Sequence, residues 1–380
     1  MQFELTELQQ EIQRTCREFA AKELAPHARQ WDREHEFPAG AIRQLGELGL
    51  MGMTVPEEHG GAGLDAVAYA VAIEELCRGC ASTGLIVGVN NSLWCDPLAA
   101  HGTEEQKKRW LAPFASGAKL GAFALTEPQA GSDATEMKTT ARLEGDGYVL
   151  NGSKCFITNG PRADAVLVFA LTDPERKHRG ISALIVPANA PGFQRGKPDD
   201  KLGIRASGTC SLFFENCRVP RENLLGKEGG GYKIAIDTLD GGRIGIAAQA
   251  LGIARAAMEE ALAYSQQRRA FGRAVYSHQA IQFMLADMAT EIDAARLLTW
   301  RAAAKKEAGQ KYGREASMAK LFASEVCGRV TTNAVQIFGG YGYTTDYDVE
   351  RHFRDAKITE IYEGTSEIQR LVIAASLLRD

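Results

Sequence analysis

The hydrophobic periodicity of the chain changes twice along its 380 residues, and this change constrains the fold more than any single motif. Up to about residue 120, apolar residues recur at three- and four-residue steps, which predicts helices. From there to about residue 230, short β-rich runs are separated by Gly, Pro, Asn and Asp, which is typical of antiparallel strands. After the glycines at 229–231 the helical period returns in long segments. We therefore predict an α+β multidomain chain, with an N-terminal α-helical domain over 1–120, a middle antiparallel β-barrel or sandwich over 121–230 and a C-terminal four-helix bundle over 231–380.

Composition and charge exclude several classes of protein. With a hydrophobic fraction of 45%, a chain of this length can bury a large core, which excludes a disordered or fibrous protein. The 44 basic and 48 acidic residues give a formal net charge of -4, which argues against a nucleic-acid partner. No apolar run approaches the roughly 18 residues that a membrane span needs. Because the N-terminus resembles no leader peptide, we expect a cytoplasmic protein or a mature organellar chain that lacks its leader.

The eight cysteines are scattered, and one Cys-x-x-Cys pair, Cys77 with Cys80, stands among them. A zinc or redox site needs a second pair or nearby histidines, and only Cys95 lies close in the sequence. Free cysteine is often buried as a small apolar residue. We therefore interpret these cysteines as core residues and predict no metal.

Two segments of the middle region contain more polar and turn-forming residues than the packing of a core requires. In 122–133 a strand breaks into Glu-Pro and then Gly-Ser-Asp, which exposes backbone N–H groups and hydroxyls that suit a polar ring edge and a phosphate. In 151–159, Phe156 and Thr158 lie two residues apart, on one side of a strand, where they can contact a flat ligand. Taken alone, the first segment fits an ordinary surface turn equally well, and the second fits a hairpin with a core Phe.

The third segment comprises 336–343 and 361–370 and contains a candidate base. Glu363 stands between Tyr362 and Gly364, just before a helix that Thr365 or Ser366 can cap. A carboxylate beside an aromatic ring is partly desolvated, which raises its pKa toward the range of a general base. The alternative is that Glu363 only stabilises the helix N-terminus electrostatically.

In this order and separation the three segments resemble the acyl-CoA dehydrogenase family of FAD enzymes, over essentially the whole chain. The stretches 358–370 and 238–247 look most like its short-chain, butyryl-CoA members. The resemblance implies a helical domain, a β-barrel domain and a helical bundle. It also implies a homotetramer or dimer of dimers in which FAD lies across a subunit interface.

The resemblance also implies the residues that hold FAD. Phe123 to Ser132 match the segment at the isoalloxazine edge and pyrophosphate, and Thr158 matches the residue that hydrogen-bonds near flavin N5. Phe156 stands where the family usually has Trp, so it keeps an aromatic face but lacks the indole N–H. Arg268 belongs to an R-x-x-F-G…Q element that, with the Gln336 segment, reaches the neighbouring subunit's FAD. The implied cofactor-binding residues are Phe123, Leu125, Thr126, Ser132, Phe156, Ile157, Thr158, Arg268, Phe271, Gln279, Gln336, Gly339, Gly340, Thr365 and Glu367.

By the same resemblance, Glu363 is the base that removes the α-proton of an acyl thioester. Some members carry the base immediately before an arginine on the first bundle helix, and here that position is Gly242, before Arg243. The substrate-binding residues implied are Ser132, Asp240, Arg243 and Gly364.

The reaction implied is the dehydrogenation of a short-chain acyl-CoA to the trans-2-enoyl-CoA, with electrons passing to an electron-transferring flavoprotein. Three alternatives stay open. The substrate is a branched or otherwise modified short acyl-CoA, the enzyme uses another acyl-CoA or passes electrons to oxygen, or the chain is a fold relative that binds nucleic acid.

Overall fold

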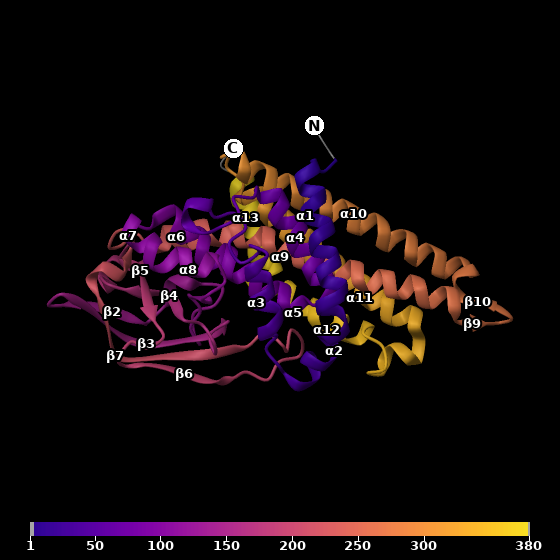
Figure 1. Ribbon diagram of the computed structural model, residues 1–380, viewed down its shortest axis with the longest axis horizontal. Coiled ribbons are helices and arrows are strands. Elements are labelled where there is room, and N and C mark those ends of the chain that lie inside the picture. The colour runs from indigo at the N-terminus through magenta and orange to yellow at the C-terminus, as the bar shows by residue number, and fades with distance from the viewer. Residues whose placement is uncertain (1–3, 379–380) are drawn as a thin grey trace.

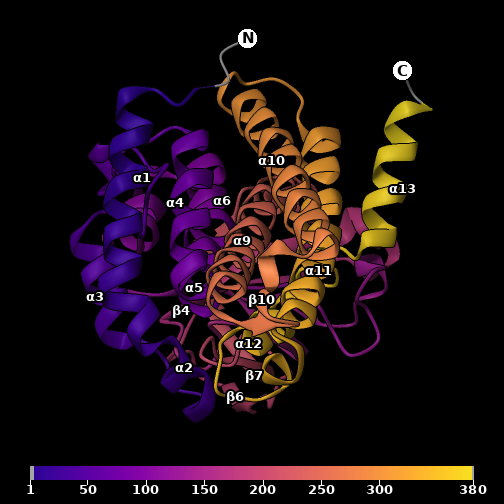
Figure 2. The ribbon, with the colours of Figure 1, turned by 90° about the vertical axis from the view of Figure 1, so that its right-hand side faces the viewer.

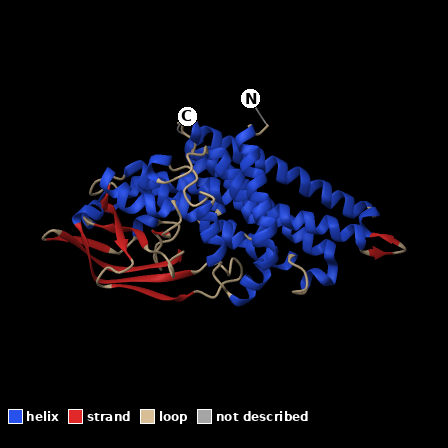
Figure 3. Ribbon diagram, viewed as in Figure 1, coloured by secondary structure: helices blue, strands red, loops and turns tan. Residues whose placement is uncertain are grey.

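The computed structural model describes residues 4–378 and shows an N-terminal helical part, a middle sheet and a C-terminal helical part (Figure 3). This order confirms the fold class predicted from the periodicity. The domain boundaries at 120 and 230 stay predictions. Among the described residues, no helix combines the length and the apolar character needed to cross a membrane.

The N-terminal part is a group of short helices around a buried hairpin of α4 and α5. Thr6 and Gln9 form a capping box at the start of α1, and Thr103 and Gln106 form another at the start of α7. Three π-helical turns, Ala20–Leu24, Val89–Cys95 and Lys107–Leu111, continue helices in this part. Its helices are α1 (Glu7–Phe19), α2 (Ala25–Glu34), α3 (Ala39–Glu47), α4 (Ala66–Gly79), α5 (Ala81–Gly88), α6 (Asp96–His101), α7 (Glu104–Gln106) and α8 (Ala112–Ala115).

The middle sheet is open and mixed, whereas the sequence predicted an antiparallel barrel or sandwich. Its main path is β6-β7-β3-β2-β4-β5-β8, and β1 pairs with β4 in parallel. The segment that follows β1 also lies beside the end of β3, since the Cys155 N–H donates to the Thr126 carbonyl at 3.0 Å. The strands are β1 (Gly121–Ala124), β2 (Thr140–Glu144), β3 (Gly147–Thr158), β4 (Ala165–Leu171), β5 (Ile181–Pro187), β6 (Phe193–Pro198), β7 (Thr209–Pro220) and β8 (Leu224–Leu225).

The C-terminal part contains one helix more than the predicted four. The additional helix α12 has a polar sequence, and it buries Arg351, His352 and Asp355 beside the apolar Val349 and Ala356. A small hairpin of β9 and β10 projects from the end of the bundle remote from the sheet, and α13 lies along an outer edge (Figures 1 and 2). The elements are α9 (Gly231–Gln267), β9 (Arg269–Ala270), β10 (Arg273–Ala274), α10 (Gln279–Glu307), α11 (Gly313–Phe338), α12 (Val349–Thr359) and α13 (Ser366–Leu377).

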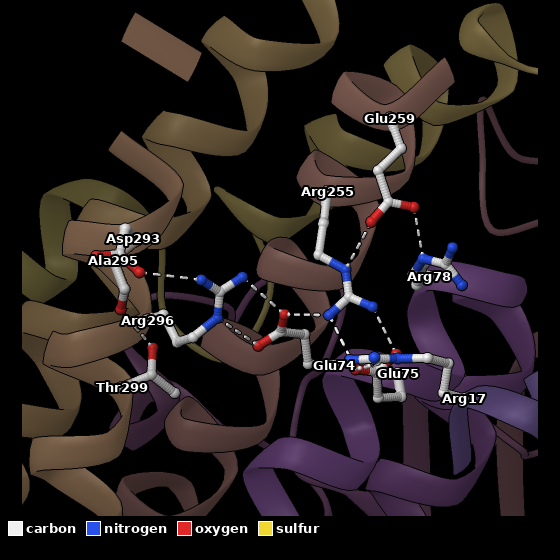
Figure 4. Close-up of polar contacts among 10 residues, drawn as sticks. All are labelled: Arg17, Glu74, Glu75, Arg78, Arg255, Glu259, Asp293, Ala295, Arg296 and Thr299. Atoms are coloured by element: carbon white, nitrogen blue, oxygen red, sulfur yellow. Dashed lines mark hydrogen bonds and ion pairs between the residues drawn. The ribbon is translucent and has the colours of Figure 1, made fainter. Parts of the chain in front are cut away.

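A network of arginines and carboxylates joins α4 to the bundle (Figure 4). Glu75 is fully buried, and it accepts hydrogen bonds from Arg255 on α9 at 2.5 Å and from Arg17 on α1 at 2.7 Å. Glu74 accepts from Arg255 at 2.8 Å and from Arg296 on α10 at 3.0 Å. Because these buried charges satisfy one another, the network fixes α4 against α9, the long first helix of the bundle.

Candidate active site

A cavity of about 250 Å³ lies where the N-terminal helices, the sheet and the bundle meet. Helix α9 lines it with a stripe at helical spacing that begins at Tyr232 and continues through Ala235, Ile236 and Leu239 to Arg243. The end of β1, the end of β3 and the turn before α13 supply the other walls. Ten of the predicted site residues line this cavity together: Phe123, Leu125, Thr126, Ser132, Phe156, Ile157, Thr158, Arg243, Glu363 and Gly364.

The turn between α12 and α13 carries Glu363 into the cavity. Glu363 has a φ of 51°, a left-handed conformation that a residue with a side chain adopts only when its surroundings impose it. Lys320 on α11 imposes part of it, since its Nζ donates to the Gly364 carbonyl at 2.7 Å. The Gln369 amide donates to the carbonyls of Glu363 at 3.2 Å and of Gly364 at 2.8 Å. The backbone of the candidate base is therefore held from two helices.

The Glu363 carboxylate is desolvated. Its Oε2 is buried and has no hydrogen-bond partner among the described residues. Burial raises the pKa of Glu363 to about 7, although Lys320 and Arg243 oppose the rise electrostatically. A carboxyl group with this pKa can accept a proton near neutral pH and release it again.

Another wall of the cavity joins the ends of β1 and β3. Lys154 is fully buried, and its Nζ donates to the Leu125 carbonyl at 3.0 Å and to Glu127 Oε1 at 2.8 Å. A bulge in β3 then turns Phe156 into a left-handed conformation with a φ of 58°, and its ring is 71% exposed. An exposed aromatic side chain beside the Thr126 and Thr158 hydroxyls suits a flat, polar-edged ring system.

Arg243 is held at the cavity from the bundle side. Its Nη1 donates to Asp240 Oδ1 at 2.5 Å and to Ser317 Oγ at 3.2 Å. Asp240 itself does not line the cavity, so it contacts the site through Arg243. Thr365 caps α13 by accepting from the Ile368 N–H at 3.3 Å, and Glu367 is exposed in the first turn of α13.

The remaining predicted cofactor residues lie outside the cavity. They belong to the β9–β10 hairpin, the start of α10 and the end of α11, and all are exposed. The Arg268 guanidinium lies over the Tyr341 ring at 5.5 Å, which places the hairpin beside the segment after α11. These residues are Arg268, Phe271, Gln279, Gln336, Gly339 and Gly340. A single chain does not bring them to the cavity.

No pattern in the sequence points to two side chains that hydrogen-bond the turn before α13. Lys320 is fully buried, yet in the sequence it looks like one of many solvated lysines on a helix. Gln369 is also fully buried. Lys320 donates to a carbonyl that lies far away in the sequence, and Gln369 donates to carbonyls across a turn. Hydrophobic periodicity does not reveal such contacts.

Three domains of one enzyme family match the chain in order. The N-terminal, middle and C-terminal domains of acyl-CoA dehydrogenase match residues 6–118, 122–217 and 229–378. The chain belongs to the acyl-CoA dehydrogenase family and is an oxidoreductase. Acyl-CoA dehydrogenases are FAD flavoproteins, and FAD is the cofactor of this chain. The hydroxyls and the exposed Phe156 ring on the cavity wall fit a flavin ring.

Within the family, the chain is similar to short-chain enzymes over its whole length. It is 56% identical over 376 residues to the mitochondrial short-chain specific acyl-CoA dehydrogenase of Rattus norvegicus, covering 99% of this chain and 91% of the relative. Butyryl-CoA dehydrogenase from Megasphaera elsdenii superposes with a TM-score of 0.98 at 48% identity, covering 100% of both chains. A chain from a study of the electron transferring flavoprotein of Acidaminococcus fermentans superposes with a TM-score of 0.99 at 54% identity, again over 100% of both.

Proposed function

We propose that this enzyme dehydrogenates short-chain acyl-CoA at the α and β carbons to give the trans-2-enoyl-CoA. The observation that carries the proposal is the Glu363 carboxylate, whose Oε2 is buried without a hydrogen-bond partner among the described residues, in a cavity that Phe156 also lines. A thioester α-C–H is a very weak acid, so a base in water does not remove its proton at a useful rate. A desolvated carboxylate with a raised pKa is suited to this step.

Each step of the proposed reaction falls to particular residues of this chain. Glu363 accepts the α-proton at its carboxylate, while its backbone N–H donates a hydrogen bond to the thioester carbonyl and stabilises the charge that develops there. Phe156, Thr126 and Thr158 hold the isoalloxazine ring, and Ser132 lies toward the CoA arm. A bound FAD would supply the acceptor for the β-hydrogen, which leaves as a hydride. Arg243 and Gly364 line the pocket for the acyl thioester.

We also propose an electron-transferring flavoprotein as the acceptor and a homotetramer as the assembly. The similarity to the chain from the Acidaminococcus fermentans study supports the electron-transferring flavoprotein as acceptor. Exposed apolar side chains support the homotetramer, because such side chains are typical of surfaces that another subunit covers. Phe271 is 95% exposed, Tyr343 91% and Leu371 64%. In such an assembly Arg268 and Gln336 reach the FAD of a neighbouring subunit. The location in the cytoplasm or in an organelle stays a prediction.

An anaerobic titration with butyryl-, isobutyryl-, 2-methylbutyryl- and octanoyl-CoA tests the proposed substrate. We expect butyryl-CoA to bleach the flavin absorbance most efficiently. A preference for either branched compound identifies the branched-chain alternative, and no bleaching by any acyl-CoA contradicts the proposal. Reoxidation by an electron-transferring flavoprotein, compared with reoxidation by oxygen, tests the acceptor.

A further inference from the structure

A single buried cation joins the segments of the middle region that line the cavity. Lys154 on β3 is fully buried, and its ammonium group donates hydrogen bonds to the Leu125 carbonyl and to the Glu127 carboxylate. The lining stretch 156–158 follows on the same strand. A bulge after Lys154 lets the lysine stay in the interior while Phe156 is exposed.

Glu127 extends this link to the loop between β1 and β2. Besides Lys154, its carboxylate accepts hydrogen bonds from three donors of the loop: the Lys138 N–H at 2.6 Å, the Thr139 N–H at 3.0 Å and the Gln129 amide at 2.7 Å. The carboxylate therefore joins the start of the loop to its end. Residues 131–135, which lie between these points, line the cavity.

The hydrogen bond to the Leu125 carbonyl acts on a peptide group at the cavity, since Leu125 and Thr126 both line it. The C=O and N–H of a trans peptide point in opposite directions. A carbonyl that accepts from the buried ammonium therefore leaves the Thr126 N–H on the opposite side, and this N–H makes no hydrogen bond within residues 4–378. Because an ammonium on the carbonyl polarises the peptide, the Thr126 N–H is strengthened as a donor for a ligand.

Both members of the buried pair are charged at neutral pH. Burial raises the pKa of Glu127, but Lys154 and the N–H donors outweigh this effect and lower it to about 2. Burial lowers the pKa of Lys154 to about 8, although Glu127 opposes this shift. Packing alone does not require such a pair, because apolar side chains of similar volume often stabilise a core equally well.

We propose that Lys154 is a positioning residue that raises the reduction potential of bound FAD through the Leu125–Thr126 peptide. This inference rests on the proposed function, which places the isoalloxazine ring against Thr126. Reduction adds electrons to that ring, so a strengthened N–H donor and a nearby cation favour the reduced form. Glu127 holds the lysine in place, and its own negative charge opposes the effect.

The midpoint potential of the FAD-loaded protein at pH 7 tests the inference, in an anaerobic reductive titration with a reference dye. At the wild-type midpoint, the reduced-to-oxidised ratio in Lys154→Met is expected to fall at least about tenfold, which is about 30 mV for a two-electron couple. Glu127→Gln keeps the lysine and removes the opposing charge, so its potential is expected to stay at or above that of the wild type. A loosened loop would instead affect both variants alike.

Lys201→Met is the matched control. Lys201 is half-buried, and its Nζ donates to the Ser207 carbonyl at 2.9 Å, outside the cavity lining. This variant loses one lysine charge and one hydrogen bond to a carbonyl, as Lys154→Met does, and is expected to keep the wild-type potential. FAD absorbance and melting temperature show whether each variant is folded. If Lys154→Met does not fold, the double variant Lys154→Met/Glu127→Gln replaces it with the same expected fall, because it leaves no buried charge without its partner.

An unchanged potential in Lys154→Met or in the double variant overturns the inference. Equal falls in Lys154→Met and Glu127→Gln also overturn it, as does failure of both Lys154 variants to fold, which would assign the pair to the stability of the chain. The titration contains no acyl-CoA. A wild type that binds FAD but is bleached by no acyl-CoA therefore contradicts the proposed function instead.

Discussion

Gly242 lies directly against the Glu363 carboxylate: a β-carbon on this glycine would stand 2.2 Å from Glu363 Oε2 and 3.0 Å from Leu93 Cδ2. The first distance is far below van der Waals contact, so the base occupies the space that a side chain at 242 would take. Position 242 on α9 must therefore lack a side chain if the base approaches from the turn before α13.

Gly242→Ala is expected to displace the carboxylate and to lower kcat about 100-fold, because catalytic groups tolerate little misplacement. The absorbance of bound FAD reports that the variant is loaded. Gly241→Ala is the control on the same helix, since the nearest atom to its β-carbon is the flexible end of Lys306 at 3.3 Å. Equal activity of Gly242→Ala and wild type would show that the carboxylate lies elsewhere during turnover.

The pH dependence of kcat/KM follows from the pKa of about 7 at Glu363. The base works as the carboxylate, so activity rises about tenfold per pH unit below pH 7 and levels off above it. A profile that is already flat between about pH 5 and pH 8 contradicts a desolvated base. Stopped-flow bleaching measures the chemical step without product release.

Lys320→Met is expected to move that inflection to higher pH. Lys320 stabilises the charged form of Glu363, and a methionine of similar length removes this charge and the hydrogen bond to the Gly364 carbonyl. Lys311→Met, an exposed lysine that precedes α11, changes the net charge equally and leaves the inflection in place. An unmoved inflection in Lys320→Met shows that the lysine acts only on the backbone of the turn.

Arg255→Met is expected to destabilise the protein by about 3–5 kcal/mol, because it leaves Glu74 and Glu75 buried with one partner fewer. The loss is measured as a lower melting temperature of the FAD-loaded enzyme. Arg14→Met breaks an exposed ion pair with Glu11 and is expected to cost less than about 1 kcal/mol. Similar melting temperatures for the two variants would contradict a structural role for the network.

Much of the fold could be predicted because each part has its own hydrophobic period. The helices of the N-terminal part, the change near residue 121 and the long helices after residue 231 follow from it. All eight cysteines are buried, which confirms their interpretation as core residues. The local pattern of a carboxylate between Tyr362 and Gly364 before a helix cap made Glu363 a candidate base, with stabilisation of the helix N-terminus as the alternative, and the family resemblance favoured the base.

What could not be predicted depends on contacts between distant segments. The parallel pairing of β1 with β4 is set by the chain path, not by alternation within either strand. Helix α12 carries a weak hydrophobic signal, because Arg351 and Asp355 are buried as charged partners beside Val349 and Ala356. Lys320 acts on the site from another helix, and a single sequence does not pair it with Gly364.

The most direct test of the account is anaerobic bleaching of Glu363→Gln by butyryl-CoA. Glutamine has nearly the shape of glutamate but cannot accept the α-proton, so the variant is expected to bind FAD, remain yellow and show no bleaching. Bleaching at the wild-type rate would contradict the assignment of Glu363 as the base.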